Sequence, residues 1–127
     1  MADARDELFG RFVRTVASDA ALMLDGWHHL VLVCHVEAGA QDLTGFSYLD
    51  DGRAVPVSPS DFTIFDVLGS LRRAMAEADG KPAWHAALFR VQRDSGAVTA
   101  EFDYDDPTRW VVRPDNMADR AREFAPL

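Results

Sequence analysis

The chain has 127 residues, of which 48% are hydrophobic and 27% charged, which is typical of a single soluble globular domain over residues 1–127. Its formal net charge of -8 argues against nucleic acid and anionic membranes as partners, because both recruit basic residues. A single cysteine, Cys34, excludes an intramolecular disulfide and a cysteine-rich zinc site. We expect no cofactor or metal. Because no export signal is recognisable at the N-terminus, we also expect a cytoplasmic location.

The N-terminal part of the chain predicts a helix followed by a buried strand. Apolar residues recur every three or four positions between Asp3 and Leu24, the spacing of one helix face, and Gly26 follows as the predicted stop. An almost unbroken run of apolar, β-branched and aromatic residues at 27–37 predicts a central strand that is covered on both sides.

Two shorter strands and a second helix are predicted next. The strands lie at 43–50 and 53–57, and Pro56 predicts that the second of them is at a sheet edge. A capping residue, a proline and an acid then precede a helical repeat of apolar residues, which predicts a helix over 59–78. Gly80 is its predicted end.

A hairpin is the clearest local pattern in the second half. Segments 84–93 and 97–104 flank a three-residue loop at 94–96, whose glycine can adopt a left-handed conformation. If Arg93 faces Ala97, alternation places an acidic row on one face of the hairpin. In this register the facing pairs are Phe89 with Glu101, Ala87 with Asp103, and His85 with Asp105.

The chain then returns as a last short strand at 108–113, which contains Trp110, and a short helix opens at Pro114 and runs through Phe124. This order of elements predicts an α+β fold. We expect an antiparallel sheet of about five to six strands, with an N-terminal helix, a middle helix and a short C-terminal helix packed on it.

Only one acid–base pair is brought together by the predicted register. His85 beside Asp103 or Asp105 fits either a general base held by a carboxylate, as in a small hydrolase, or an ordinary cross-strand ion pair. No serine or cysteine is placed beside it. The acids at 101–106 also lack the ligand spacing of a calcium loop. We therefore expect a protein that is not an enzyme.

The remaining candidate is a protein-binding surface. Glu101, Asp103 and Asp105 alternate along one strand and its turn, which predicts a flat acidic face that attracts a basic protein. Three aromatic side chains are predicted as anchors if they are exposed: Phe89, Tyr104 and Trp110. The alternative interpretations are a solvated hairpin face for the acids and core packing for the aromatic residues.

The segment from Trp84 to Pro114 resembles the C-terminal part of the YezG-like immunity protein family. The resemblance is carried by an apolar strand LFRV, a polar turn with glycine, the run EFDYDD, and RW with a following proline. It implies a small acidic α+β cytoplasmic protein of bacteria that binds and neutralises a secreted toxin. In that family setting, Asp103, Tyr104 and Trp110 are alternatively framework residues.

We therefore expect a non-enzymatic bacterial immunity-type protein that occludes a cognate toxin, as a monomer or a homodimer. The first alternative is a dimeric protein similar to a secretion chaperone, which holds exported effectors. The same order of helices and strands suits that class, which requires an exposed apolar groove. The second alternative is a small hydrolase that uses His85.

Overall fold

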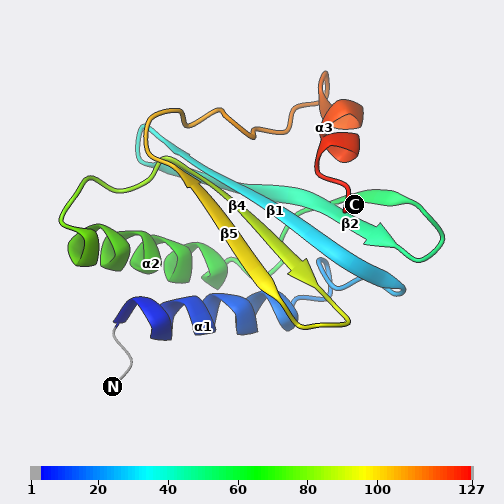
Figure 1. Cartoon of the computed structure of the whole chain (residues 1–127), viewed down its shortest axis with the longest axis horizontal. Helices are drawn as coiled ribbons and strands as arrows, with labels where there is room; N and C mark the ends of the chain where they lie inside the picture. Colours follow the sequence, from blue (N-terminus) through cyan, green and yellow to red (C-terminus); the bar gives the residue numbers. More distant parts are fainter. Residues whose placement is uncertain (1–3, 127) are drawn as a thin grey trace.

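The apolar run at 27–37 forms β1 (Trp27–Glu37), the central strand of an antiparallel sheet in a computed structural model that describes residues 4–126. The sheet has five strands in the spatial order β3-β2-β1-β4-β5 (Figure 1). The other strands are β2 (Ala40–Leu49), β3 (Ala54–Val57), β4 (Ala86–Gln92) and β5 (Val98–Asp103). The predicted α+β class is confirmed, and β3 lies at an edge as Pro56 predicts.

Helices cover both faces of this sheet. On one face, α1 (Ala4–Ala17) and α2 (Thr63–Asp79) lie side by side, and α3 (Met117–Glu123) lies across the other face (Figure 1). Alternate residues of β1 supply two separate cores: Leu30 and Leu32 pack toward α1 and α2, whereas Val31 and Val33 pack with the C-terminal segment. This double cover explains why β1 is apolar along its length instead of alternating with polar residues.

The first helix is shorter than predicted, because α1 ends at Ala17 and not near Leu24. Asp3, where the helical pattern starts, lies outside the described residues. Leu22 continues the apolar pattern and is fully buried, but it lies in the turns that follow the helix. The cause is Asp19, whose buried carboxylate accepts hydrogen bonds from the backbone N–H groups of Ala21, Ser60 and Asp61 and from the hydroxyl of Ser60. This contact ties the turn after α1 to the segment before α2.

Replacing Asp19 with asparagine is expected to lower the free energy of unfolding at pH 7 by about 2 kcal/mol, because hydrogen bonds to a charged acceptor are lost. Burial alone would raise the pKa of Asp19, but the hydrogen bonds outweigh it and hold the pKa below the ordinary 3.8. The stabilisation is therefore complete above the pKa of the unfolded carboxyl, and it disappears as pH falls through the lower folded-state pKa. Urea unfolding of both proteins between pH 7 and pH 3 measures the difference; a difference that stays constant would contradict this assignment.

The second helix begins later than predicted, at Thr63 instead of 59. Asp61 accepts hydrogen bonds from the backbone N–H and hydroxyl of Thr63, so it organises the turn just before the helix. The end of the helix agrees with the prediction. Gly80 has a φ of 64°, and its N–H donates to the carbonyl of Ala76, which is a left-handed helix stop.

The prediction of a strand at 108–113 is wrong, because these residues form turns and irregular chain. Asp106 accepts hydrogen bonds from the backbone N–H and hydroxyl of Thr108. The carbonyl of Val111 accepts hydrogen bonds from the side chains of Asn116 and Arg120, so it is occupied by the α3 region and not by a neighbouring strand. The C-terminal helix itself is present, but it begins at Met117 and not at Pro114.

The hairpin between β4 and β5 exists, but the predicted register is wrong by one residue. Its loop has four residues, 93–96, because the backbone N–H of Gln92 donates to the carbonyl of Ala97. The N–H of Arg93 donates instead to the carbonyl of His28 in β1, so it points away from β5. Gly96 takes the expected left-handed conformation, with a φ of 68°. The shift changes the facing pairs, which become Leu88 with Glu101 and Ala86 with Asp103.

Candidate protein-binding surface

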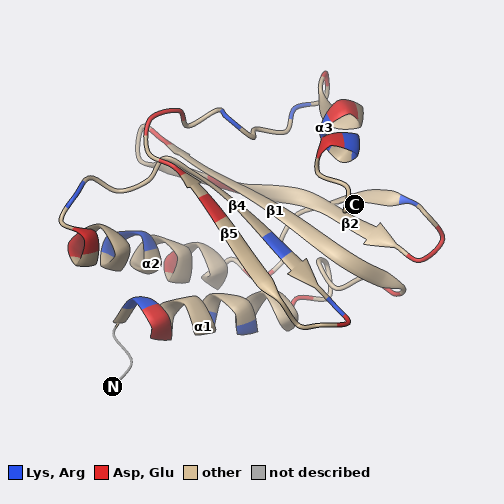
Figure 2. Ribbon diagram, in the orientation of Figure 1, with Lys and Arg blue, Asp and Glu red and all other residues tan. Residues whose placement is uncertain are grey.

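The three predicted acids lie along β5 and the turn that follows it, and we call them the acidic surface: Glu101, Asp103 and Asp105. β5 is an edge strand, so this surface borders an unpaired side of the sheet. Figure 2 shows acidic segments on β5 and on the loop after it. Glu101 and Asp105 are exposed, and within residues 4–126 their carboxylates have no hydrogen bond or ion pair. They are free to meet a basic group.

Asp103 differs from its neighbours because it organises the turn. Its Oδ1 accepts the backbone N–H groups of Asp105 and Asp106 at 2.8 and 2.7 Å, and Arg109 approaches its Oδ2 at 3.3 Å. Hydrogen bonds from Asp106 and Asp105 lower the pKa of Asp103, with Arg109 adding to the effect. Its side chain is only 15% exposed. Asp103 therefore holds the exposed acids in place more than it presents charge.

Two of the three predicted aromatic anchors are buried. Phe89 is 0% exposed and its ring lies 4.6 Å from that of Phe12, inside the core beneath α1 and α2. Trp110 is 6% exposed and packs in the second core, with the guanidinium of Arg109 over its ring. An anchor must be exposed, and neither of these two side chains is. The observed register places Phe89 opposite Ala100 and away from the acids, on the face that α1 and α2 cover.

Tyr104 is the partly accessible member of the aromatic set. It is half-buried against the main core, and the ammonium of Lys81 lies 4.1 Å from the centre of its ring. Tyr104 follows directly after Asp103, so it lies between the two exposed acids in sequence. The ring packs against the core beneath α1 and α2, whereas Glu101 and Asp103 face Leu88 and Ala86 of the second core, so the ring and these acids lie on opposite faces of the sheet.

The predicted acid–base pair of His85 with Asp103 or Asp105 does not form through the predicted register. Asp103 faces Ala86, the neighbour of His85, so the two side chains leave opposite faces of the sheet. The contact that does exist is between backbones, where the N–H of His85 donates to the carbonyl of Asp103 at 2.8 Å. The Asp103 carboxylate is already occupied by the turn, so it does not orient an imidazole.

The cysteine is equally unsuited to nucleophilic chemistry. Cys34 is fully buried in the main core, and burial raises the pKa of its thiol to about 12. Between residues 4 and 126, no group of three or more histidine, cysteine, aspartate or glutamate side chains is placed to share a metal ion.

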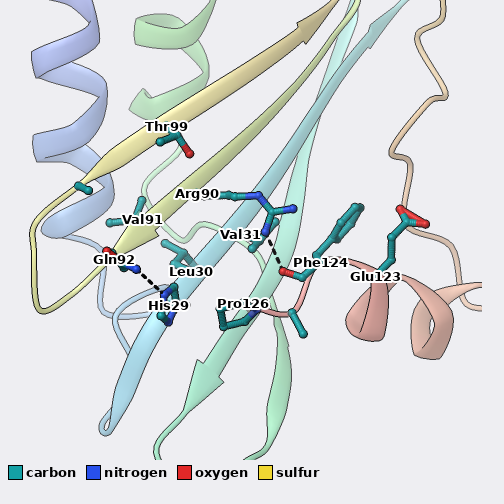
Figure 3. Close-up of a pocket in the computed structure, with 12 residues that line it drawn as sticks. His29, Leu30, Val31, Arg90, Val91, Gln92, Thr99, Glu123, Phe124 and Pro126 are labelled. Carbon is teal, nitrogen blue, oxygen red and sulfur yellow. Dashed lines mark hydrogen bonds between the residues drawn. The ribbon is translucent and has the colours of Figure 1, made fainter.

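A cleft of about 620 Å³ lies on the α3 face of the sheet, the face from which Glu101 also projects, where the sheet meets the end of the chain (Figure 3). β1, β4 and β5 form its floor, and the residues after α3 form its wall. Arg90 crosses it and donates from Nη1 to the carbonyl of Phe124 at 2.8 Å. Sequence reasoning missed this cleft because its wall is set by the packing of α3; the one local signal was an arginine within the apolar strand LFRV.

In the described part of the chain, no helix has the length and apolar character needed to cross a membrane. Comparison of the sequence with protein-family models and with curated proteins gives no match. The resemblance to the YezG-like immunity proteins therefore stays a prediction.

Proposed function

We propose that this chain is a non-enzymatic immunity-type protein that binds a basic toxin through the acidic surface and neutralises it by occlusion. The observation that carries the proposal is the pair of exposed carboxylates of Glu101 and Asp105, which lack ionic partners within the described chain. Two like charges held at one sheet edge create a negative potential that attracts a partner with basic groups.

The position of these acids supports occlusion. They border β5, an edge strand, and a partner that meets them also approaches the unpaired side of the sheet. Asp103 accepts a hydrogen bond from the backbone N–H of Asp105, so the charge of Asp105 is held on an ordered turn. Such preorganised charge gives fast, steered association.

Reversing the two exposed charges, with Glu101→Lys and Asp105→Lys together, is expected to slow association with the toxin about tenfold at low salt and to flatten its salt dependence. The toxin is first captured from the native lysate with tagged protein, and association rates are then measured at two ionic strengths. The matched control is Asp66→Lys with Glu77→Lys, which reverses two exposed acids on α2. Equal slowing in both double variants would show that net charge alone acts, and no slowing in either would reject the acidic surface.

A second candidate, the secretion-chaperone-like dimer, is supported by an apolar groove of about 220 Å³. The groove lies between α1, α2 and β5 and is lined by Phe9, Leu71, Met75, Ala100 and Phe102, together with Arg5 and Asp6. The order of helices and strands is also the one expected for that class. Light scattering and capture from the native lysate together separate the candidates. An obligate dimer that captures several exported proteins favours the chaperone, whereas capture of one basic protein favours immunity.

A further inference from the structure

The cleft on the α3 face contains a guanidinium with unused hydrogen-bonding capacity. Arg90 is half-buried, and only its Nη1 is engaged, by the carbonyl of Phe124. Among residues 4–126, no group accepts a hydrogen bond from its Nε or Nη2, and no carboxylate forms an ion pair with it. Nε and Nη2 form the side-on fork of a guanidinium, which matches the two oxygens of a carboxylate.

A hydroxyl lies directly across the strands from this guanidinium. Thr99 faces Arg90 in the pairing of β4 with β5, and Val31 faces Arg90 in the pairing of β1 with β4, so all three side chains rise from one face of the sheet. Within the described chain, the Thr99 hydroxyl has no hydrogen-bond partner. Figure 3 shows Thr99 and Arg90 on the same side of the sheet, above the strand that carries Val31.

The other polar groups of the cleft are already paired with one another. Ser95 donates to the side-chain oxygen of Gln92, whose amide lies 3.1 Å from Nε2 of His29, and Nδ1 of His29 lies 2.6 Å from Nδ1 of His28. Burial and the neighbouring His28 lower the pKa of His29, so its ring is neutral near pH 7.

Glu123, the acid at the rim, is also engaged, because Arg120 donates to both of its carboxylate oxygens. The capacity left for a ligand is therefore concentrated at Arg90 and Thr99.

We infer that this cleft binds a small organic carboxylate. Its carboxylate takes the free edge of Arg90, with the Thr99 hydroxyl as a further donor, and its apolar body packs on the half-buried Ala125 and Pro126. The cleft volume of about 620 Å³ and its apolar lining with few polar groups are those of small-molecule sites. The single guanidinium and the apolar wall favour a carboxylate over inorganic phosphate. The inference does not rest on the proposed toxin binding: the two sites share no residue, although Glu101 lies two residues from Thr99 on the same face of β5.

Titration with benzoate, followed by ¹H–¹⁵N NMR of the full chain, tests the inference. We expect saturable shifts that centre on the backbone amides of residues 90, 99 and 124. Benzamide, the neutral isostere, and inorganic phosphate, which lacks an apolar body, are each expected to bind at least tenfold more weakly. Absence of saturable shifts with benzoate, or binding of benzamide or phosphate as strong as that of benzoate, would overturn the inference.

Variants locate the binding to the predicted groups. Arg90→Gln is expected to weaken benzoate binding at least tenfold, and Arg53→Gln, which removes the same charge from an exposed turn, is expected to leave it unchanged. Because Arg90 also holds the carbonyl of Phe124, Thr99→Val gives a second test without that contact, with an expected loss of about fivefold. Equal weakening by Arg53→Gln, or full binding by both Arg90→Gln and Thr99→Val, would show that the cleft is not the site.

Discussion

Replacing Gly45 with alanine is expected to destabilise the protein by more than about 3 kcal/mol, a large part of the roughly 5–15 kcal/mol by which a typical domain is stable. Gly45 lies in β2 where the strand approaches β1, and an added Cβ would lie 1.8 Å from the carbonyl oxygen of Val31 and 2.8 Å from its carbon. These are backbone atoms of the central strand, so a rotamer change cannot relieve the clash. β1 and β2 must separate, and the pairing that organises both cores is lost.

Urea unfolding followed by circular dichroism measures the effect of Gly45→Ala, and Gly10→Ala is its matched control. An added Cβ at Gly10 meets the end of the flexible Arg14 side chain at 3.3 Å, within α1. The same substitution should there raise the free energy of unfolding by up to about 1 kcal/mol, because alanine favours the helix. Wild-type stability for Gly45→Ala would mean that β2 does not approach β1 as closely as described.

Replacing Phe89 with alanine is expected to lower the free energy of unfolding by about 3–5 kcal/mol, the usual effect of removing a large buried ring. The Phe89 side chain is fully buried, and its ring contacts those of Phe12 and Phe102 at 4.6 and 6.1 Å between centres. In the alanine variant, the cavity left by the ring would lie between the sheet and α1, where the surrounding strands and helices cannot easily move in to fill it.

This result separates a core role for Phe89 from the role of a surface anchor. An anchor would lose binding on truncation and leave the free energy of unfolding unchanged. The control is Phe62→Ala: Phe62 is 71% exposed, so its truncation should change stability by no more than about 0.5 kcal/mol. Equal stability of the two variants, measured by thermal and urea unfolding, would contradict the burial of Phe89.

The elements that sequence predicts best are those with a strong local pattern. β1 was predicted with its observed bounds because its run of apolar and β-branched residues is almost unbroken, and the end of α2 was predicted because Gly80 suits a left-handed stop. The predictions that failed depend on distant groups. α1 ends early because Asp19 binds Ser60 and Asp61, a contact across some forty residues that helical periodicity cannot reveal.

The register error shows how one distant hydrogen bond changes a predicted site. The hairpin sequence allows a loop of three or four residues, and the N–H of Arg93 selects the longer loop by bonding to His28 in β1. The shift by one residue places Ala86, and not Ala87, opposite Asp103. The acids of the candidate surface were still found, because alternation along a single strand does not depend on the register with its neighbour.

The most direct test of the proposed function is the growth of bacteria that express the basic protein captured by this chain. The account predicts that the partner arrests growth, that the wild-type chain restores it, and that the folded Glu101→Lys, Asp105→Lys double variant does not. Restoration by the wild type and the double variant alike would contradict a role for the acidic surface. A captured partner that leaves growth unaffected would contradict the immunity function itself.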